Sequence, residues 1–457
     1  MNIALVNPVP EKIIELHGTD RPHIGLGYLS SYLRKNIPDI NLTVIDGKCE
    51  QLSRIELIDR IIAFKPDIVG LTSFTMEIYD TAYIAKMIKS NNKNTRICIG
   101  GVHVIGVEEQ VLEEFTDFDF AVIGEGEVVL KNLLNAISED KSPENIKGLI
   151  YRDNNGKARK NIPDDLVYDI DSLPIPDWSF VPRGKSYPIM SARGCPFRCI
   201  FCMRPYGNSP RVRSPERVVD EIEFVHSTYD AKKFIFYDES LGAMRSNFNE
   251  ILDLIIVRGL NRKISFEGHT HVNIVKPELF QKMKEAGFTN IGFGAESGDD
   301  EILKNIGKSI NTEKIYKAVR WAKKAGLRTS AYFILGMPNE TYKSAFKTIS
   351  FAKKLNTDTI SIGIMIPFPK TKVYEMVHNG DNGYIKPATV IRWDEFNKQT
   401  SNPLRYKKVN HRILRLIQIL GYLYHTIGNL RIKSLFVRLL DNRRQILNMF
   451  QNILTKD

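Results

Sequence analysis

Two series of short β-branched runs, each alternating with stretches of helical periodicity, constrain the fold of this chain most strongly. The first series covers residues 1–140, and its expected strands are almost continuously apolar, which is typical of a parallel sheet covered on both faces. It predicts a doubly wound, flavodoxin-like or Rossmann-like domain, which binds ligands at the carboxyl ends of its strands. The expected strands are Ile3–Asn7, Leu42–Asp46, Asp67–Ser73, Thr95–Gly100 and Asp119–Ile123, and the expected helices are Gly25–Asn36, Ser53–Phe64, Met76–Ser90, Val107–Phe115 and Glu125–Ile137.

Residues 141–185 are expected to form a small hairpin and a linker, because Gly148–Arg152 and an Asn155–Gly156 turn precede a proline-punctuated stretch. The second series covers residues 186–400. Its six strand–helix units predict a partial (β/α)6 barrel with an active site at the C-terminal strand ends. The expected strands are Ile189–Ala192, Lys233–Asp238, Ile264–Gly268, Asn290–Ala295, Thr329–Leu335 and Thr359–Ile364, and the expected helices include Glu216–Ser227, Pro277–Ala286, Thr312–Ala325 and Tyr342–Lys354.

The C-terminal region, residues 401–457, is expected to be helical, apolar and basic. Its longest uncharged run, Leu416–Leu430, is 15 residues long and too polar to span a bilayer. Two interpretations remain: a helical cap packed on the barrel, or a basic amphipathic helix pair at an anionic membrane surface. Within His411–Leu454 the net charge is +6, out of +11 for the whole chain. The basic residues of this stretch are Arg412, Arg415, Arg431, Lys433, Arg438, Arg443 and Arg444, against the single acid Asp441.

The composition indicates a globular protein, with 43% hydrophobic and 26% charged residues among 457. No run of 18 apolar residues occurs, and the N-terminus leads directly into an expected strand, so a cytoplasmic protein is expected. The five cysteines are too few for a disulfide scaffold. Three of them lie within eight residues, which points to metal or redox chemistry.

These three residues, Cys195, Cys199 and Cys202, form a CxxxCxxC loop after an expected strand. A four-iron cluster is normally held by four cysteines. Because Cys49 and Cys98 belong to the first domain, three thiolates would leave one iron open to a substrate or cofactor, as catalytic metal sites do. A zinc site or buried structural thiols are the alternatives. Zinc would need a fourth ligand, and no histidine lies at a zinc-finger spacing.

The cysteine loop resembles that of the radical SAM enzymes, in which CxxxCxxC holds a [4Fe-4S] cluster. The resemblance implies that the open iron binds S-adenosylmethionine (SAM), which reduction cleaves to a 5′-deoxyadenosyl radical. It continues at three strand ends, Phe236–Ser240, Gly292–Gly298 and Ile334–Glu340, which correspond to contacts with the SAM amino group, ribose and adenine. The usual Gly-Gly-Glu is absent, so Asp238 or Glu239 would bind the ammonium. The implied SAM-binding residues are Phe201, Met203, Asp238, Glu239, Glu296, Ser297, Ile334 and Gly336, and His269 and His271 are further candidates for contact with SAM or substrate.

The first domain resembles the cobalamin-binding domain of cobalamin-dependent radical SAM enzymes. Glycines at its strand ends would let the backbone approach a large flat ligand, and small hydroxyl side chains would bind it. The Asp-x-His-x-x-Gly motif of other cobalamin proteins is missing, and Asp20-Arg-Pro-His23-Ile-Gly25 has a shifted spacing. A module without cobalamin is the alternative. The implied cobalamin-binding residues are His23, Gly25, Thr72, Ser73, Gly100, Gly101, His103, Gly124, Glu125, Gly126 and Glu127.

The resemblance implies an anaerobic, cobalamin-dependent enzyme that methylates an unactivated carbon of a small-molecule or lipid-like substrate. It also implies an external electron donor of the flavodoxin or ferredoxin type. Alternative activities are those of a radical SAM cyclase, ring-contracting or carbon–carbon coupling enzyme, or of a radical SAM enzyme without cobalamin. A non-catalytic iron–sulfur sensor is disfavoured, because a sensor needs no SAM pocket. No nucleic-acid partner is expected, because aromatic residues are not interleaved with the basic ones on the barrel.

Overall fold

The computed structural model describes residues 1–11, 21–163, 167, 169–184, 186–399, 401 and 403–429. These residues divide into two compact units. The first unit contains residues 1–195, 204–238 and 257–265, and the second contains residues 196–203, 239–256 and those from 266 onwards.

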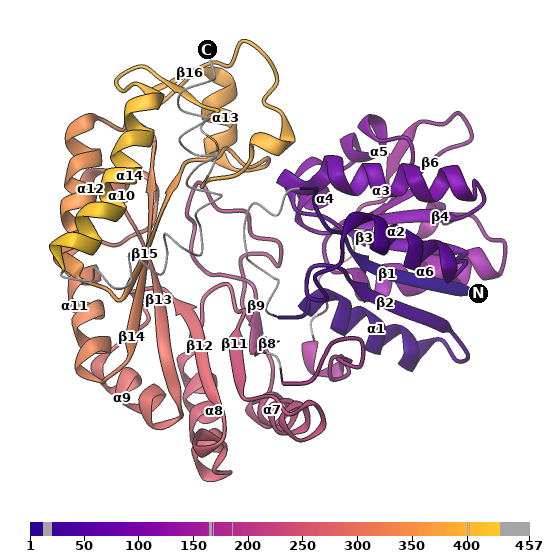
Figure 1. Ribbon diagram of the computed structural model, residues 1–457, viewed down its shortest axis with the longest axis horizontal. Helices are drawn as coiled ribbons and strands as arrows, with labels where there is room; N and C mark the ends of the chain where they lie inside the picture. The colour runs from indigo at the N-terminus through magenta and orange to yellow at the C-terminus, as the bar shows by residue number, and fades with distance from the viewer. Residues whose placement is uncertain are drawn as a thin grey trace. The chain divides into compact units, whose positions relative to one another are not determined.

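Five parallel strands form the centre of the first unit, in the order β2-β1-β3-β4-β5 (Figure 1). This is the order of a flavodoxin-like sheet, so the predicted doubly wound domain is confirmed. The strands are β1 (Asn2–Asn7), β2 (Asn41–Asp46), β3 (Ile68–Thr72), β4 (Arg96–Gly100) and β5 (Phe120–Val122). The helices are α1 (Ile24–Asn36), α2 (Arg54–Ala63), α3 (Ile78–Asn91), α4 (Val102–Val107), α5 (Gln110–Glu114) and α6 (Gly126–Ser138).

A large part of the core of this unit lies where β1 meets helices α1 and α6. Ile3 and Leu5 of β1 pack in one cluster with Leu33 of α1 and with Leu130 and Leu133 of α6, and all five side chains are buried. Burial of each side chain of this kind contributes roughly 1.5–3 kcal/mol. The strand and helix periodicities in the sequence therefore place their apolar faces against each other.

The predicted hairpin belongs to the same sheet. Its strands β6 (Leu149–Arg152) and β7 (Ala158–Lys160) are antiparallel, and β6 pairs antiparallel with β5. The sequence predicted the hairpin but not its attachment to the sheet. Pairing with β6 satisfies the backbone groups of β5, which would otherwise form an open edge.

The helix predicted over Val107–Phe115 is wrong in its bounds. Helix α4 starts earlier, at Val102, and the chain then turns at Glu108, whose φ is 52°, before α5 begins. A left-handed residue cannot continue an α-helix, so the apolar pattern is divided between two short helices.

The second series supplies the six predicted barrel strands. In the first unit, β8 (Ser186–Ile189) pairs in parallel with β11 (Lys233–Phe236), and β9 (Ala192–Arg193) pairs antiparallel with β10 (Arg211–Val212). In the second unit, β12 (Ser265–Thr270), β13 (Phe288–Glu296), β14 (Arg328–Leu335) and β15 (Thr359–Ile364) pair in parallel. The accompanying helices are α7 (Pro215–Tyr229), α8 (Arg245–Val257), α9 (Pro277–Glu285), α10 (Asp300–Asn305), α11 (Thr312–Lys324), α12 (Tyr342–Leu355) and α13 (Lys372–Asn379).

The first barrel strand was predicted at Ile189–Ala192, and this prediction is wrong in its bounds because β8 ends at Ile189. Beyond the strand, the backbone forms a hydrogen bond with a side chain instead of with a neighbouring strand. The Ser191 N–H donates to Asp238 Oδ1 at 2.8 Å, and the Ser191 hydroxyl donates to Asp238 Oδ2. A carboxylate therefore replaces the sheet as the partner of this segment.

Strands β13 and β14 have two chemically different faces. One face carries large apolar side chains, including Phe293 and Phe333, and Phe333 packs edge-on against Phe351 of α12. The opposite face carries Gly292 and Gly294 on β13 and Tyr332 on β14. Period-two alternation thus leaves the face away from the helices with glycine and polar residues.

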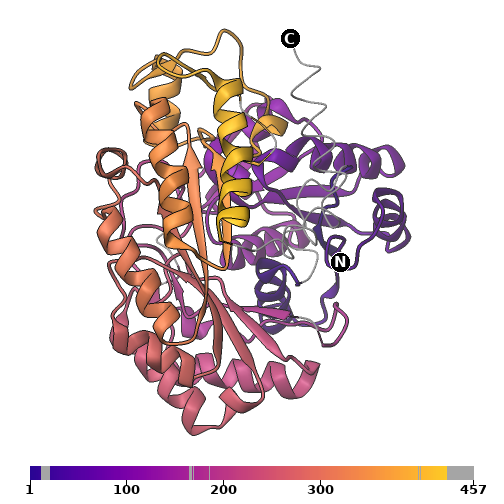
Figure 2. The same ribbon diagram turned by 60° about the vertical axis from the view of Figure 1, so that its left-hand side comes forward.

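Helix α14 (His411–Gly428) lies beside α12 (Figure 2) and covers the outer edge of β15. Gln418 Nε2 donates to the Ile362 carbonyl at 2.6 Å, and the Ile362 N–H donates to the Tyr422 hydroxyl at 2.8 Å. These two side chains hydrogen-bond to backbone groups of an edge strand, as expected if the C-terminal region is a cap packed on the barrel. The rest of the predicted tail, including Arg431, Lys433, Arg438, Asp441, Arg443 and Arg444, lies outside the described residues.

Two small strands, β16 (Tyr384–Ile385) and β17 (Arg405–Tyr406), form an antiparallel pair in the second unit. They lie in the segment that connects α13 to α14. Among the helices formed by described residues, none combines the length and the apolar character needed to cross a bilayer.

Candidate radical SAM and cobalamin site

The segment Pro196–Met203, which carries two of the three motif cysteines, is tied to the second unit through Ile200. The Ile200 N–H donates to the Ile306 carbonyl at 3.1 Å, and the Val373 N–H donates to the Ile200 carbonyl at 3.4 Å. Cys199 is half-buried and Cys202 is exposed, and Cys202 N donates to the Cys199 carbonyl at 3.2 Å. The loop is thus held by its backbone between the end of α10 and the start of α13.

Cys195 is half-buried and ends the main segment of the first unit. Its N–H donates to the Gly207 carbonyl at 3.2 Å. Phe201 and Met203 are half-buried. Within the described part of the chain, no three His, Cys, Asp or Glu side chains are arranged to hold a metal ion, so the sequence spacing carries the assignment of the three thiols.

A histidine ring stacks on the cysteine segment. The rings of Phe197 and His271 are parallel to within 16°, with centroids 3.5 Å apart. Burial, followed by the charge of Lys308, lowers the pKa of His271 to about 3, so the imidazole is neutral at pH 7. His271 was a candidate for contact with SAM or substrate, but the structure assigns its ring face to the loop.

Glu296 lies at the end of β13 in a left-handed conformation, with φ 60°. Its carboxylate forms an ion pair with Lys308, and both side chains are buried. A Cβ on Gly294 would collide with this pair, so glycine at that position makes room for it. Lys308, which lies 12 residues after Glu296, was not predicted as a site residue. Its ion pair fixes the direction of the Glu296 side chain.

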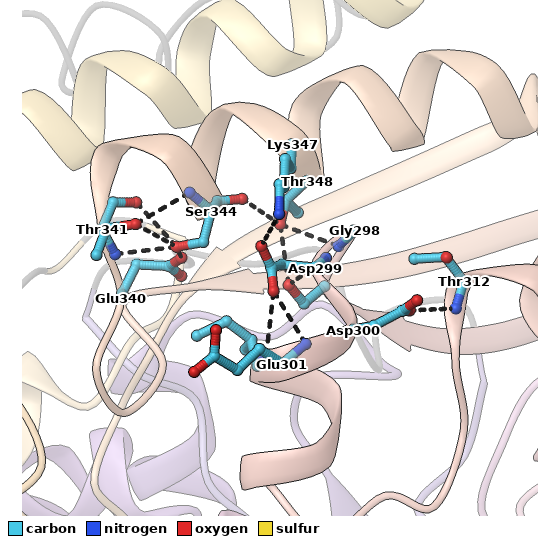
Figure 3. A network of polar contacts seen from close by, with 12 residues as sticks. Gly298, Asp299, Asp300, Glu301, Thr312, Glu340, Thr341, Ser344, Lys347 and Thr348 are labelled. Carbon is cyan, nitrogen blue, oxygen red and sulfur yellow. Dashed lines mark hydrogen bonds and ion pairs between the residues drawn. The ribbon is translucent and has the colours of Figure 1, made fainter.

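Ser297 packs the end of β13 against helix α12. It is fully buried, its hydroxyl lies 3.1 Å from the Thr348 hydroxyl of α12, and the Asp299 N–H donates to it at 3.1 Å. Figure 3 shows the same network, in which Lys347 Nζ contacts Asp299 at 2.6 Å. These contacts join the end of β13 to α12, so Ser297 holds the backbone that carries Glu296.

Gly336 follows β14, and both of its backbone groups are engaged. Its N–H donates to Glu340 Oε2 at 3.2 Å, and its carbonyl accepts from the Tyr384 hydroxyl at 2.9 Å. Its φ is 81°. Burial raises the pKa of Glu340 to about 7, in spite of a hydrogen bond from Ser344 (Figure 3). Ile334, two residues earlier, is half-buried.

His269 on β12 and Tyr332 on β14 meet across Gly292 of β13. His269 Nε2 and the Tyr332 hydroxyl are 2.7 Å apart, and the two rings are edge-to-face. A Cβ at position 292 would collide with both rings. His269 is exposed, so this imidazole–phenol pair offers hydrogen-bonding atoms on the strand face opposite the helices.

Asp238, predicted to bind the SAM ammonium, is buried and bonded to Ser191. Burial raises its pKa to about 6. Glu239 follows it, is half-buried and belongs to the second unit. The structure therefore gives Asp238 a role in fixing the chain after β8, and Glu239 is the remaining acid of this motif.

The strand ends of the first sheet differ in how much space they leave. A Cβ on Gly100 or on Gly124 would meet no atom within 4 Å, whereas one on Gly101, whose φ is 98°, would lie 2.8 Å from Thr72 Oγ1 and from the Ser73 carbonyl. Ser73 also accepts a hydrogen bond from Thr81, and its carbonyl accepts from the His103 N–H. The fold thus requires glycine at position 101, whereas the backbone at Gly100 and Gly124 has free space beside it.

His23 caps helix α1. Its Nδ1 accepts from the Leu26 N–H at 3.3 Å, and its own N–H donates to Asp46 at 2.7 Å. Burial, followed by the charge of Lys48, lowers the pKa of His23 to about 4. Gly25 lies against this ring.

Burial likewise lowers the pKa of His103 to about 4. Asp20, the first residue of the shifted motif, lies outside the described residues.

Glu125 and Glu127, predicted as cobalamin contacts, bind two arginines of the same unit. Arg193 contacts Glu125 at 3.0 Å and Glu127 at 2.7 Å, and Arg211 contacts Glu125 at 2.8 Å. Burial opposes ionisation of Glu125, but the hydrogen bonds and charges of Arg211 and Arg193 outweigh it and lower its pKa. Gly126, between the two acids, lies against Leu29. This buried cluster ties a loop of the first sheet to the chain two residues before Cys195.

Comparison with known proteins decides between the families. The radical SAM superfamily model matches residues 189–352, and the B12-binding domain model matches residues 12–134. An uncharacterized methyltransferase of Pyrococcus horikoshii is 36% identical over 385 residues, which cover 82% of this chain and 83% of that protein. The chain belongs to the cobalamin-dependent radical SAM family.

Two further relatives support the fold and the breadth of the family. The anaerobic magnesium-protoporphyrin IX monomethyl ester cyclase of Rubrivivax gelatinosus is 29% identical and covers 84% of this chain and 73% of its own length. The solved structure of the cobalamin-dependent SAM radical enzyme OxsB, with aqua-cobalamin and SAM bound, superposes with a TM-score of 0.77 at 18% identity, covering 98% of this chain and 72% of that one.

This radical SAM enzyme uses a [4Fe-4S] cluster, SAM and cobalamin. The residues present fit these groups: three thiols in eight residues suit a cluster with one open iron, and the space beside Gly100 and Gly124 suits a ligand that lies against the backbone. Sequence reasoning missed Lys308, Tyr332 and Arg193. None of them belongs to a motif. Tyr332 lies in an expected strand and Arg193 directly follows one, whereas Lys308 lies 12 residues after Glu296 and has no such signal.

Proposed function

We propose that this protein is a cobalamin-dependent radical SAM methyltransferase that methylates an unactivated carbon of a small molecule. When bound, the reduced cluster supplies the 5′-deoxyadenosyl radical from SAM, and cobalamin supplies the methyl group. The name of the Pyrococcus horikoshii relative, a methyltransferase, and the presence of both domain models on one chain support this activity.

The observation that carries the proposal is the anchoring of Ile200 between Ile306 and Val373. Because these bonds hold the segment Pro196–Met203 on the unit that carries the ends of β12, β13 and β14, the thiols of Cys199 and Cys202 share one scaffold with the proposed SAM contacts at these strand ends. Cofactor enzymes depend on such positioning, since the cofactors supply the difficult chemistry.

We assign roles to the three cysteines of the motif and to residues of the second unit. Cys195, Cys199 and Cys202 hold the cluster, and Phe201 and Met203 flank the bound SAM. The Glu296 carboxylate, oriented by Lys308, and the backbone at Ile334 and Gly336 contact the nucleoside, while Glu239 is the acid for the ammonium. The exposed His269–Tyr332 pair then contacts the substrate, because its hydrogen-bonding atoms lie on the strand face opposite the helices.

We assign cobalamin to the strand ends of the first domain, residues 1–140, with the hairpin and linker at 141–185, the radical SAM core at 186–400 and the C-terminal region at 401–457. Gly100 and Gly124 are the proposed points of backbone contact, because a ligand could approach them within van der Waals distance. Thr72, Ser73, Gly101 and His103 shape the loop between them.

The electron donor is proposed to be a flavodoxin or ferredoxin type of protein, as the reductive cleavage of SAM requires a one-electron source. A peripheral membrane contact would have to involve the outer face of α14 and residues 430–457. Within α14, Ile413, Leu416, Leu420, Leu423 and Ile427 are exposed apolar residues at helical spacing.

A cyclase is the second candidate activity, since a relative with that name covers 84% of this chain. SAM carrying a deuterated methyl group separates the two. A methyltransferase should transfer the label to product and form both 5′-deoxyadenosine and S-adenosylhomocysteine. A cyclase should form 5′-deoxyadenosine alone, and this result would refute methyl transfer.

The cysteine assignment is tested with the same assay. Replacement of Cys195, Cys199 or Cys202 by Ser should remove the iron and abolish SAM cleavage, because each thiolate is a cluster ligand. Cys49→Ser is the matched control and should retain the iron content. An equal loss of iron in that control would contradict a cluster held by three cysteines.

A further inference from the structure

A cavity of about 380 Å3 opens over the β16–β17 pair and is lined by basic residues. It lies entirely in the second unit. Among the described residues that line it, none is Asp or Glu. The lining residues are Tyr342, Ile385, Arg405, Tyr406, Lys407, Lys408, Val409, Asn410 and His411.

Two helices begin at this cavity. Tyr342 is the first residue of α12 and His411 is the first residue of α14, and the Asn410 N–H donates to the Tyr342 hydroxyl at 2.8 Å. The helices run in the same direction, because Gly421 of α14 lies against Ile349 of α12 and Gly428 lies against Lys353 (Figure 2). Their N-termini therefore lie at the same end of the pair.

The N-terminus of α14 adds positive potential to the cavity. A helix presents roughly half a positive charge at its N-terminus, and the first turn of α14 contains no acidic residue that would offset it. The N-terminus of α12 is different, because the Glu340 carboxyl bonds to Ser344 in its first turn. Arg405, Lys407 and Lys408 make the lining of the cavity basic. Lys407 Nζ donates to the Gly380 carbonyl at 2.7 Å, and a neutral carbonyl leaves its charge in place.

We propose that this cavity binds the phosphate group of a small molecule. A phosphomonoester carries about −1.5 to −2 charges at pH 7 and accepts several hydrogen bonds, which matches a guanidinium, two ammonium groups and the N-terminus of α14 better than one carboxylate does. The volume exceeds that of a phosphate ion, so it leaves room for the esterified group. This site goes beyond the proposed methyl transfer and does not depend on it.

His411 provides a reporter inside the cavity. Burial, then the charges of Arg405 and Arg412, lower the pKa of its imidazole. A bound phosphate dianion would reverse the electrostatic part of this effect. In full-length holoenzyme labelled with 13C-histidine, the pKa of His411 should rise when inorganic phosphate replaces chloride at equal ionic strength. The His411→Asn variant identifies the resonance.

Thermal unfolding provides the second measurement. Inorganic phosphate should raise the Tm of the holoenzyme saturably, and ribose 5-phosphate should do so at lower concentration, because a ligand that binds only the folded state stabilises it. The double variant Arg405→Gln/Lys408→Gln should lose both responses. Lys343→Gln, which removes an exposed charge from the first turn of α12 outside the cavity, is the matched control and should keep them.

The variant His411→Glu tests the same site in case the double variant does not fold. An acid at the first position of α14 favours the helix, so this variant should fold normally and still lose the phosphate response by occupying the site with its own negative charge. Equal responses of the wild type, the double variant and His411→Glu would overturn the proposal. Binding to phosphatidylglycerol vesicles that depends on Arg405 and Lys408, without any response to the soluble phosphates, would also overturn it in favour of a membrane contact.

Discussion

The phenol of Tyr406 occupies the space into which any side chain at position 336 would project. Gly336 is thus contacted by the Tyr384 hydroxyl and the Glu340 carboxyl through its backbone, and by Tyr406 where a side chain would lie. The strand end at which we place SAM is therefore closed by residues that follow it by up to 70 positions in the chain.

Gly336→Ala is expected to destabilise the fold and to weaken SAM binding. The left-handed conformation alone costs a non-glycine residue about 1–2 kcal/mol, and displacement of Tyr406 adds about 1–3 kcal/mol. Gly259→Ala is the control, because Gly259 has a φ of 66° but a Cβ there meets no atom within 4 Å. Denaturant unfolding of both variants separates the two costs, and equal losses would show that Tyr406 is not displaced.

Gly100→Val tests the cobalamin site. Because a Cβ at this position meets no atom within 4 Å, the fold should accept the substitution, while the added side chain blocks the approach of the corrin. The cobalamin content after reconstitution should fall at least tenfold, a loss of about 1.4 kcal/mol in binding, with an unchanged iron content. Undiminished cobalamin would place the cofactor elsewhere.

The same substitution at Gly101 serves as the contrast. Its Cβ would lie 2.8 Å from Thr72 and Ser73, and its φ is 98°, so Gly101→Val should lower the free energy of unfolding itself. Loss of cobalamin in that variant would therefore carry no information about the ligand.

The buried carboxyl of Glu340 predicts a pH dependence of stability. Its pKa is about 7 in the folded protein and near 4.5 in the unfolded chain, so the folded state holds the proton more tightly. Stability should fall as the pH rises from about 4.5 to about 7, by about 3 kcal/mol in total from this group, and then level off.

Glu340→Gln should remove this part of the pH dependence, because glutamine does not titrate and can still accept from the Gly336 N–H. Urea unfolding of the variant and the wild type between pH 5 and pH 8, within the range set by this pKa, measures the difference. Glu278→Gln, at an exposed position in α9, is the control. Parallel pH profiles for Glu340→Gln and the wild type would contradict the buried-acid assignment.

Removal of residues 404–457 should make the protein aggregate, since it exposes the edge of β15. The Ile362 N–H and carbonyl would lose Tyr422 and Gln418, and a buried backbone group left unpaired costs about 1–3 kcal/mol. Removal of residues 430–457 leaves α14 in place and should preserve the fold. Size-exclusion chromatography and liposome sedimentation of both truncations distinguish a cap from a membrane contact: a soluble, monomeric product of the longer truncation would refute the cap.

The alternating periodicity predicted the fold because strand and helix patterns depend on local spacing. The five strands of the first domain and all six barrel strands lie where the sequence predicts them, apart from the bounds of the first barrel strand. That strand was misplaced because Ser191 bonds to Asp238, which lies 47 positions away. A period-two pattern cannot report such a long-range partner.

The site was predictable only where a motif fixes the backbone. The CxxxCxxC spacing and the glycines at strand ends are properties of consecutive residues, so they indicate the cluster loop and the open strand ends. The use of each charged side chain depends on its partner in space. The sequence predicts Glu125 and Glu127 as ligand contacts, but in the structure they form ion pairs with Arg193 and Arg211. The sequence around Glu296 likewise does not indicate its ion pair with Lys308.

The buried cluster of Arg193 with Glu125 and Glu127 has a consequence for how the enzyme is made. The two glutamates are synthesised more than 60 residues before Arg193, and N-terminal domains generally fold first as a chain leaves the ribosome. The first domain can therefore already offer its carboxylates when Arg193 emerges, followed two residues later by Cys195. Capture of this arginine would position the start of the cysteine loop before the rest of the barrel exists, so cluster assembly in the nascent chain would depend on a cobalamin domain that has already folded.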